Sequence, residues 1–206
     1  MGKGDGALNE DDAARAVSAD PEAVLLAKYG AGDPGAAAEL ARLLAPRLLG
    51  FATRQLGDKA EAEDIVQETM LRLWKIAATW QPGGAKVSTW AFRVAANLCT
   101  DRRRRTGRQK ATDPSDFDQL EDSTPGQEAK IARQQRAAAL EAALLELPER
   151  QRQAVILRHI EGLPNPEIAA VMEIGVEAVE SLTARGKRSL SARLLPKREQ
   201  LGLDDG

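Results

Sequence analysis

Residues 147–190 read LPERQRQAVILRHIEGLPNPEIAAVMEIGVEAVESLTARGKRSL, and this stretch indicates the fold more clearly than any other. Pro148 is expected to open a helix and Gly162 to follow its last turn, because proline suits the first helical turn and glycine suits the position after the last. Asn165 is then expected to cap a short helix that has Pro166 at its first position. The stretch therefore predicts two consecutive helices with a glycine-containing break between them.

A further helix is expected from about residue 176 to 194, after a tight turn at 173–175. Val176, Val179 and Leu182 should face inward, because they recur at helical spacing. A short helix, a tight turn and a longer helix are typical of a helix-turn-helix, whose second helix enters the major groove of DNA. The candidate DNA contacts on this helix are Glu177, Glu180, Ser181, Arg185, Lys187 and Arg188.

The composition of the whole chain favours an all-α protein. Its 206 residues are rich in Ala and Leu, 29% are charged, and the net charge is −2. No global positive field attracts DNA, so any DNA contact must come from local patches. The single cysteine excludes an intramolecular disulfide and a cysteine-rich metal site. No apolar run reaches the ~18 residues of a membrane span, and the N-terminus lacks an apolar signal core, so we expect a cytoplasmic protein without membrane insertion.

Helical patterns fall in two blocks that flank an acidic, turn-rich middle segment. That segment combines aspartates and glutamates with prolines and glycine, which is typical of a flexible linker. We therefore predict two small helical domains, the C-terminal one a helix-turn-helix. The predicted boundaries are a disordered segment 1–20, a first domain 21–106, a linker 107–127, a second domain 128–196 and a tail 197–206.

In the first block, the stretch LGDKAEAEDIVQETMLRLWKIAATW has a clear helix start. Asp58 is a plausible N-cap with Glu61 three residues later, which together form a capping box. One side of the helix is apolar at helical spacing. That side carries Ile65, Val66, Thr69, Met70, Leu73, Ile76 and Ala77, and the opposite side carries Asp64, Gln67, Glu68, Arg72 and Lys75.

The next helix is expected to start at Ser88, a good N-cap residue. Its apolar side carries Ala91, Val94, Ala95 and Leu98, and a different face carries Trp90, Arg93, Asn97, Thr100 and Arg104 within the run Arg102 to Arg105. An aromatic ring, an amide and guanidinium groups on one face can stack on a base, bond its edge and neutralise phosphate. The alternative is a packed tryptophan beside a solvated arginine run.

These segments occur in the order AEDIVQETMLRLWK, STWAFRVAANLCTDRRRR, an acidic linker, and then the helix-turn-helix stretch. In this order and spacing, the chain resembles the extracytoplasmic-function (group IV) RNA polymerase sigma factors, small two-domain relatives of sigma-70. The resemblance covers about residues 22–195. It implies a transcription initiation factor that binds core RNA polymerase and directs it to specific promoters. It also implies that the acidic linker threads the polymerase channel that later carries RNA.

The resemblance assigns roles to three sets of residues. The first set would contact the polymerase, at the β′ clamp helices: Asp64, Gln67, Glu68, Leu71, Arg72 and Trp74. The second set would bind and melt the minus-10 promoter element: Lys86, Trp90, Arg93, Asn97, Arg102, Arg103 and Arg104, with the loop 81–87 receiving a flipped base. The third set would read the minus-35 element from the helix that starts at residue 176. The β subunit, promoter DNA and an anti-sigma factor are the further partners implied.

The chain departs from the family pattern around this recognition helix. Many relatives have LGxS before it, whereas this chain has Met172 to Gly175, so a glycine replaces the serine cap. Glu180 stands where many relatives have a lysine, and Leu182 stands near a common arginine position. A glutamate can accept a hydrogen bond from cytosine N4, but it also repels phosphate. For Glu177, a merely solvated side chain is the alternative to base reading.

Other functional classes fit the sequence less well. An enzyme is disfavoured because His159 and Cys99 lack partners, and no phosphate loop or metal-ligand spacing occurs. We expect no cofactor and no metal. Cys99 is expected to be a buried, inert thiol, the alternative being a redox switch activated by the neighbouring arginines. A helix-turn-helix repressor, or a sigma mimic that sequesters an anti-sigma factor without activating polymerase, remains the alternative function.

Overall fold

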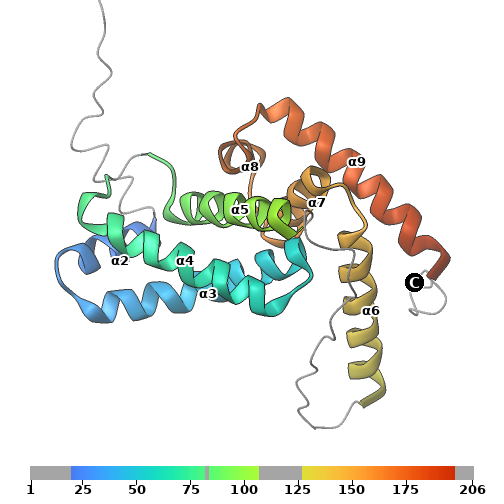
Figure 1. Ribbon diagram of the computed structural model, residues 1–206, viewed down its shortest axis with the longest axis horizontal. Coiled ribbons are helices and arrows are strands. Elements are labelled where there is room, and N and C mark those ends of the chain that lie inside the picture. Colours follow the sequence, from blue (N-terminus) through green and yellow to red (C-terminus); the bar gives the residue numbers. More distant parts are fainter. Residues whose placement is uncertain (1–19, 82–83, 107–126, 198–206) are drawn as a thin grey trace, which may run out of the picture.

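The computed structural model describes residues 20–81, 84–106 and 127–197, and within these ranges every regular element is helical (Figure 1). This confirms the all-α prediction. Residues 1–19 of the predicted segment 1–20, residues 107–126 of the predicted linker 107–127 and residues 198–206 of the predicted tail 197–206 lie outside the described residues. The elements are α2 (Pro21–Gly30), α3 (Pro34–Leu56), α4 (Lys59–Ile76), η1 (Ala77–Thr79), α5 (Val87–Thr106), α6 (Gln127–Leu145), α7 (Glu149–Val155), η2 (Ile156–Ile160), α8 (Asn165–Met172), α9 (Val176–Leu194) and η3 (Leu195–Lys197).

Helices α2 to α5 form a first bundle around a continuous apolar core. On α3, the inward residues recur every three or four positions, as an amphipathic helix requires. The fully buried members on this helix are Leu40, Leu44, Leu48, Phe51 and Ala52. Phe51 meets Phe92 of α5 edge to face, with ring centroids 5.5 Å apart, a favoured arrangement for aromatic pairs. These contacts fix α5 on α3.

The turn between α3 and α4 follows the predicted cap. Gly57 ends α3 with φ 76°, a left-handed conformation that glycine adopts without strain. Asp58 then starts α4, and its Oδ1 accepts a hydrogen bond of 2.9 Å from the backbone N–H of Glu61. The apolar stripe predicted for this helix is buried at Ile65, Thr69, Met70, Leu73 and Ala77. The sequence prediction of this helix is therefore confirmed.

The start of α5 differs from the prediction. The helix begins at Val87, so Ser88 lies in its first turn rather than at the N-cap. Two carboxylates from the start of α2 cap it instead: Asp20 Oδ2 accepts from the N–H of Val87 at 3.3 Å, and Glu22 Oε2 accepts from the N–H of Ser88 at 2.9 Å. Local sequence cannot reveal caps supplied from 66 residues away.

Helices α6 to α9 form a second bundle that contains the helix-turn-helix, α8 and α9. The expected cap of α8 is wrong by one position, because Pro164 is the N-cap and Asn165 is already helical. Gly175 is the N-cap of α9. Val176 was expected to face inward but is 40% exposed, because it lies in the first turn of α9. Val179 is fully buried, as predicted.

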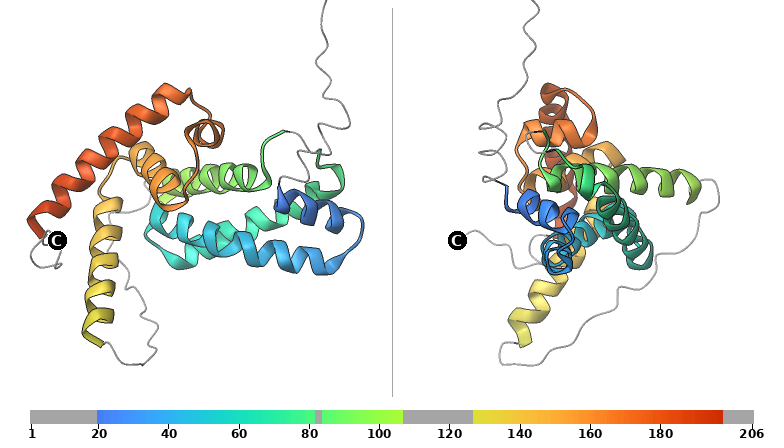
Figure 2. Two further views of the ribbon diagram at one scale, coloured as in Figure 1. Left: turned by 180° about the vertical axis from the view of Figure 1, so that it is seen from behind. Right: turned by 90° about the vertical axis from the view of Figure 1, so that its left-hand side faces the viewer.

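The two bundles pack against each other (Figures 1 and 2). Helix α5 of the first bundle packs against α8, and α3 contacts α6, α7 and η2. We call this interface the seam. Buried side chains of both bundles belong to one continuous cluster, so the helix-turn-helix is docked on the first bundle.

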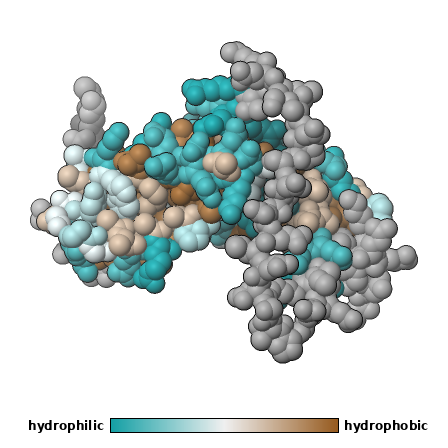
Figure 3. All heavy atoms as spheres, turned by 60° about the horizontal axis from the view of Figure 1, so that its bottom comes forward, coloured by the Kyte–Doolittle hydropathy of each residue, from teal (hydrophilic) through white to brown (hydrophobic). Residues whose placement is uncertain are grey.

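On the face that Figure 3 shows, the coloured surface is largely polar, with apolar residues between the polar ones in small groups. The large apolar side chains that the described surface exposes lie apart in the sequence: Leu43, Leu71, Ile160, Val176 and Leu195. Scattered apolar residues of this kind are normal on a protein surface. No described helix is long and apolar enough to cross a membrane.

Candidate nucleic-acid interface

The residues proposed for minus-35 reading lie on the outer face of α9. Glu177, Glu180, Arg185, Lys187 and Arg188 are exposed, and Ser181 is half-buried. Two internal hydrogen bonds orient this face: Arg185 Nη2 donates to Ser181 Oγ at 2.8 Å, and Asn165 Nδ2 of α8 donates to Glu180 Oε1 at 3.3 Å. The sequence placed Asn165 as a cap and missed this link between the two helices. The arrangement presents cations and hydrogen-bonding groups together, as major-groove contact requires.

The residues proposed for minus-10 binding on α5 do not form one free surface. Asn97 and Arg104 are exposed, whereas Trp90 and Arg93 are half-buried. Trp90 packs edge to face on Trp80, with ring centroids 6.3 Å apart. The indole is therefore held in place and offers part of its surface for stacking.

The arginine run divides between two environments. Arg102 reaches back to α4, where it pairs with Glu61 at 3.7 Å and Asp64 at 3.5 Å. Arg103 faces the seam, where its Nη1 donates to the backbone oxygen of Gln55 at 3.1 Å. Because like charges on adjacent turns repel, these internal partners offset part of the repulsion within the run.

The residues proposed to contact polymerase lie on one side of α4. Asp64, Gln67, Leu71 and Arg72 are exposed, and Glu68 bonds Arg72 at 2.8 Å across one helical turn. Leu71 leaves 47% of its surface exposed, which gives this charged face an apolar centre.

Trp74, the last residue proposed for polymerase contact, is half-buried and packs edge to face on Tyr29, with centroids 4.9 Å apart. It thus helps to hold α2 on α4. Asp64 contacts Arg102, so the proposed polymerase face and the arginine run are directly linked.

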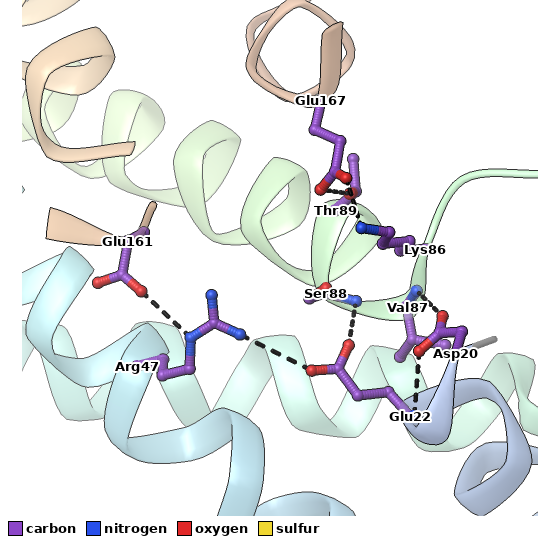
Figure 4. A network of polar contacts seen from close by, with 9 residues as sticks. All are labelled: Asp20, Glu22, Arg47, Lys86, Val87, Ser88, Thr89, Glu161 and Glu167. Carbon is purple, nitrogen blue, oxygen red and sulfur yellow. Dashed lines mark hydrogen bonds and ion pairs between the residues drawn. The ribbon is translucent and has the colours of Figure 1, made fainter. Parts of the chain in front are cut away.

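Polar contacts that the sequence did not predict join the seam beside these residues (Figure 4). Glu167 of α8 accepts from two groups of the first bundle: Lys86 Nζ lies 2.6 Å from its Oε1, and Thr89 Oγ1 donates to its Oε2 at 3.1 Å. Arg47 of α3 lies between Glu161, at 3.3 Å, and Glu22, at 3.7 Å. No short-range sequence pattern signals these pairs, because their members are far apart along the chain.

Three titratable groups report the electrostatics of the second bundle and the seam. The hydrogen bond and charge of Glu167 raise the pKa of Lys86 above its ordinary value. Burial raises the pKa of Glu161, against the opposing effect of Arg47. Burial, with help from the charges of Lys187 and Arg158, lowers the pKa of His159. Lys86, which was proposed to contact DNA, is therefore engaged by an internal carboxylate.

Cys99 is buried in the first bundle. Burial, and next the charge of Glu149, raise the pKa of its thiol to about 12, although Arg103 and Arg102 act in the opposite direction. The predicted burial of Cys99 is confirmed, and because the thiolate is the reactive form, the raised pKa favours an inert thiol over the arginine-activated switch. Among the described residues, no group of three or more His, Cys, Asp and Glu side chains could hold a metal ion.

Comparison with known proteins identifies the family. The model of Sigma-70 region 2 matches residues 40–109, and that of Sigma-70, region 4 matches residues 137–190. The ECF RNA polymerase sigma factor EcfG of Rhodopseudomonas palustris is 32% identical over 161 residues, which cover 78% of this chain and 86% of that protein. This chain belongs to the ECF sigma factor family. The predicted recognition of the family is therefore confirmed.

Other relatives of this ECF sigma factor agree. SigM of Mycobacterium tuberculosis is 33% identical over 84% of either chain. SigE of Mycolicibacterium smegmatis is 36% identical over 74% of this chain, but the match spans only 59% of that longer protein. A solved structure of CnrH in complex with the cytosolic domain of CnrY superposes with a TM-score of 0.62 at 25% identity, covering 85% of this chain and 97% of CnrH.

Proposed function

We propose that this protein is a transcription initiation factor that binds core RNA polymerase and directs it to promoters with specific minus-10 and minus-35 elements. The observation that carries the proposal is the presence of region 2 and region 4 of sigma-70 in one chain, in that order. A repressor needs only the helix-turn-helix, whereas an initiation factor also needs the first bundle. Such a protein works in the cytoplasm, where polymerase and promoters are found, and is not an enzyme.

The exposed side of α4 supports polymerase binding. Its charged residues surround the exposed Leu71, and an apolar centre with a polar rim is the usual anatomy of a protein interface. We assign Asp64, Gln67, Glu68, Leu71, Arg72 and Trp74 to this contact, with Trp74 acting from its packed position against Tyr29.

The solvent-facing part of α5 supports minus-10 binding. Arg104 and Asn97 are exposed on it, and Trp90 is held by Trp80 with part of its surface free. Stacking on an aromatic ring and neutralisation of phosphate together offset the cost of unstacking a base, a few kcal/mol. Lys86, Arg93, Arg102 and Arg103 complete the assigned set.

The outer face of α9 supports minus-35 reading, by Glu177, Glu180, Ser181, Arg185, Lys187 and Arg188. Its exposed cations supply phosphate contacts, and Glu180, steadied by Asn165, supplies an acceptor for a base edge. Control by an anti-sigma factor is part of the proposal, because solved relatives include CnrH bound to CnrY and an RpoE bound to the anti-sigma factor NepR, which matches with a TM-score of 0.59.

Run-off transcription with bacterial core polymerase, on a pool of promoter DNA from the host, tests this function. We expect discrete transcripts that depend on the protein. Arg93→Ala with Arg104→Ala should abolish promoter opening while leaving polymerase binding intact. The matched control is Arg42→Ala with Arg133→Ala, which removes two exposed cations elsewhere. Stable binding to an anti-sigma factor without polymerase binding would favour the mimic, and duplex DNA binding without polymerase would favour the repressor.

A further inference from the structure

The charges across the seam are arranged with one sign on each side. Among the residues that the structure describes, four ion pairs join the bundles: Arg47 with Glu161 at 3.3 Å, Arg54 with Glu141 at 4.0 Å, Lys86 with Glu167 at 2.6 Å, and Arg103 with Glu149 at 4.0 Å. In all four, the cation comes from the first bundle and the carboxylate from the second. Opposite charges so ordered favour docking, and salt weakens them.

Glu167 contacts Lys86 in the way that a phosphate group of a nucleic acid would. Each of its two oxygens has its own donor, the ammonium of Lys86 and the hydroxyl of Thr89 (Figure 4). Ammonium and hydroxyl groups are common donors to nucleic-acid phosphates. The carboxylate of Glu167 therefore engages the ammonium group of Lys86, and α8 packs against the start of α5.

Further along α5, Glu149 of α7 makes the same kind of contact. Its Oε1 accepts from Thr100 Oγ1 at 2.8 Å, and its Oε2 lies 4.0 Å from Arg103 Nε. Thr100 belongs to the helix face that carries Arg93, Asn97 and Arg104. The second bundle thus covers one border of the α5 surface from its first turn to its last.

The seam is nevertheless poorly suited to stay closed permanently. Between α5 and the helices α7 and α8 lies a polar cavity of about 330 Å³ that opens to solvent and is lined among others by the exposed residues Asn97, Arg104, Arg150 and Glu173. At its other end the fully buried Arg152 leaves Nη2 without a hydrogen-bond partner. Buried polar groups that lack partners favour the hydrated, open state.

We propose that the glutamates of the second bundle form an intramolecular latch, in which Glu149 and Glu167 hold the second bundle against α5 and keep this border of the minus-10 surface from DNA until the bundles separate. The closed state is inferred from the contacts across the seam alone, whereas its effect on promoter binding rests on the proposed function. The phosphates of promoter DNA compete with these carboxylates for Lys86, and binding that separates the bundles frees the α5 border.

Closure is tested on the full chain alone, by small-angle scattering over about 50 to 500 mM salt. We expect Glu149→Gln with Glu167→Gln to enlarge the radius of gyration at low salt and the wild type to expand only as salt rises. The control, Glu39→Gln with Glu146→Gln, removes the same charge from pairs within one bundle, Glu39 with Arg42 and Glu146 with Arg193, and should behave as wild type. Equal helicity by circular dichroism shows that all three are folded.

The consequence is tested by promoter binding and transcription with core polymerase. Loss of the two pairs should raise the apparent affinity of the holoenzyme for promoter DNA about tenfold at low salt, since half-exposed pairs each contribute modestly. Equal radii for wild type and latch variant would overturn the latch. An expanded variant with unchanged promoter affinity would overturn its inhibitory role. Failure of every variant to support transcription would contradict the proposed function, while the scattering result would still decide closure.

Discussion

Arg152 of α7 lies fully buried against Gln55 of α3, with its Nε 3.3 Å from Gln55 Oε1. Its Nη1 donates to the backbone oxygen of Leu145 at 3.0 Å, and no described carboxylate pairs with it. Arg152 Nη2 and Gln55 Nε2 are both buried without hydrogen-bond partners. A buried cation opposite a neutral amide is costly, so the contact limits the stability of the docked bundles.

Gln55→Glu should therefore stabilise the docked state. The substituted carboxylate would face the guanidinium of Arg152 and replace an amide N–H that has no acceptor. A hydrogen bond between charged groups contributes about 1.5 to 3 kcal/mol, so we expect the free energy of unfolding in urea at neutral pH to rise by about that amount.

A second substitution tests whether the stabilisation by Gln55→Glu depends on the cation of Arg152. With Arg152→Met already present, Gln55→Glu should instead lower the free energy of unfolding by about 3 kcal/mol or more, because the carboxylate is then buried without a cation. The same sign in both backgrounds would contradict the assigned pairing.

Two glycines within helices should respond to alanine in opposite directions. A Cβ at Gly186 of α9 would lie 2.5 Å from Val155 Cγ2 and 3.1 Å from the backbone oxygen of Gln151, so Gly186→Ala should destabilise the second bundle by about 1 to 3 kcal/mol. At Gly50 of α3 the close atom is Nη1 at the end of the flexible Arg54 side chain. Gly50→Ala should therefore raise stability by about 0.5 to 1 kcal/mol, through helix propensity. Thermal unfolding of both variants checks the contrast.

Cys99 should make stability fall at alkaline pH. In the folded protein its thiol has a pKa of about 12. In the unfolded chain the pKa of a cysteine thiol is about 8.5. The unfolded chain therefore binds fewer protons within this window. Stability is fully present below the unfolded pKa and declines above it, by up to about 1.4 kcal/mol per pH unit.

The control for this effect is Cys99→Ala, which keeps the other alkaline titrations and should show a flatter decline between about pH 8 and 10. Native Cys99 should also react with a thiol reagent at pH 8 only as fast as the protein opens. Labelling at the rate of a free cysteine, or identical pH profiles for the two proteins, would contradict the buried thiol.

The capping contact of Asp58 should be measurable by itself. Asp58→Ala removes the acceptor of the Glu61 N–H and should cost about 1 kcal/mol of stability. Asp58→Asn keeps an oxygen at the same position and should cost much less. Urea unfolding of both variants makes the comparison, and equal losses would assign the effect to charge rather than to the cap.

Wherever neighbours along the chain decide the structure, the sequence was sufficient. The cap at Asp58, the buried stripe of α4 and the order of α8 and α9 follow from spacing and from turn residues. Helix formation and amphipathicity depend on contacts within a few residues, so these elements can be predicted from the sequence alone. The order of the motifs was likewise enough to identify the family.

Only the tertiary structure decided which residues far apart in the sequence contact each other, both within the first bundle and across the seam. Glu22 caps α5 in place of Ser88, Glu167 holds Lys86, and Arg103 turns from the solvent toward Gln55. Each contact joins residues far apart in sequence, and its geometry depends on how the helices pack, for Glu167 and Lys86 on how the two bundles dock. Residue type and periodicity fix which face of a helix is polar, but the partner of a charge depends on packing, because Coulombic and hydrogen-bonding energies act over a few ångströms of space.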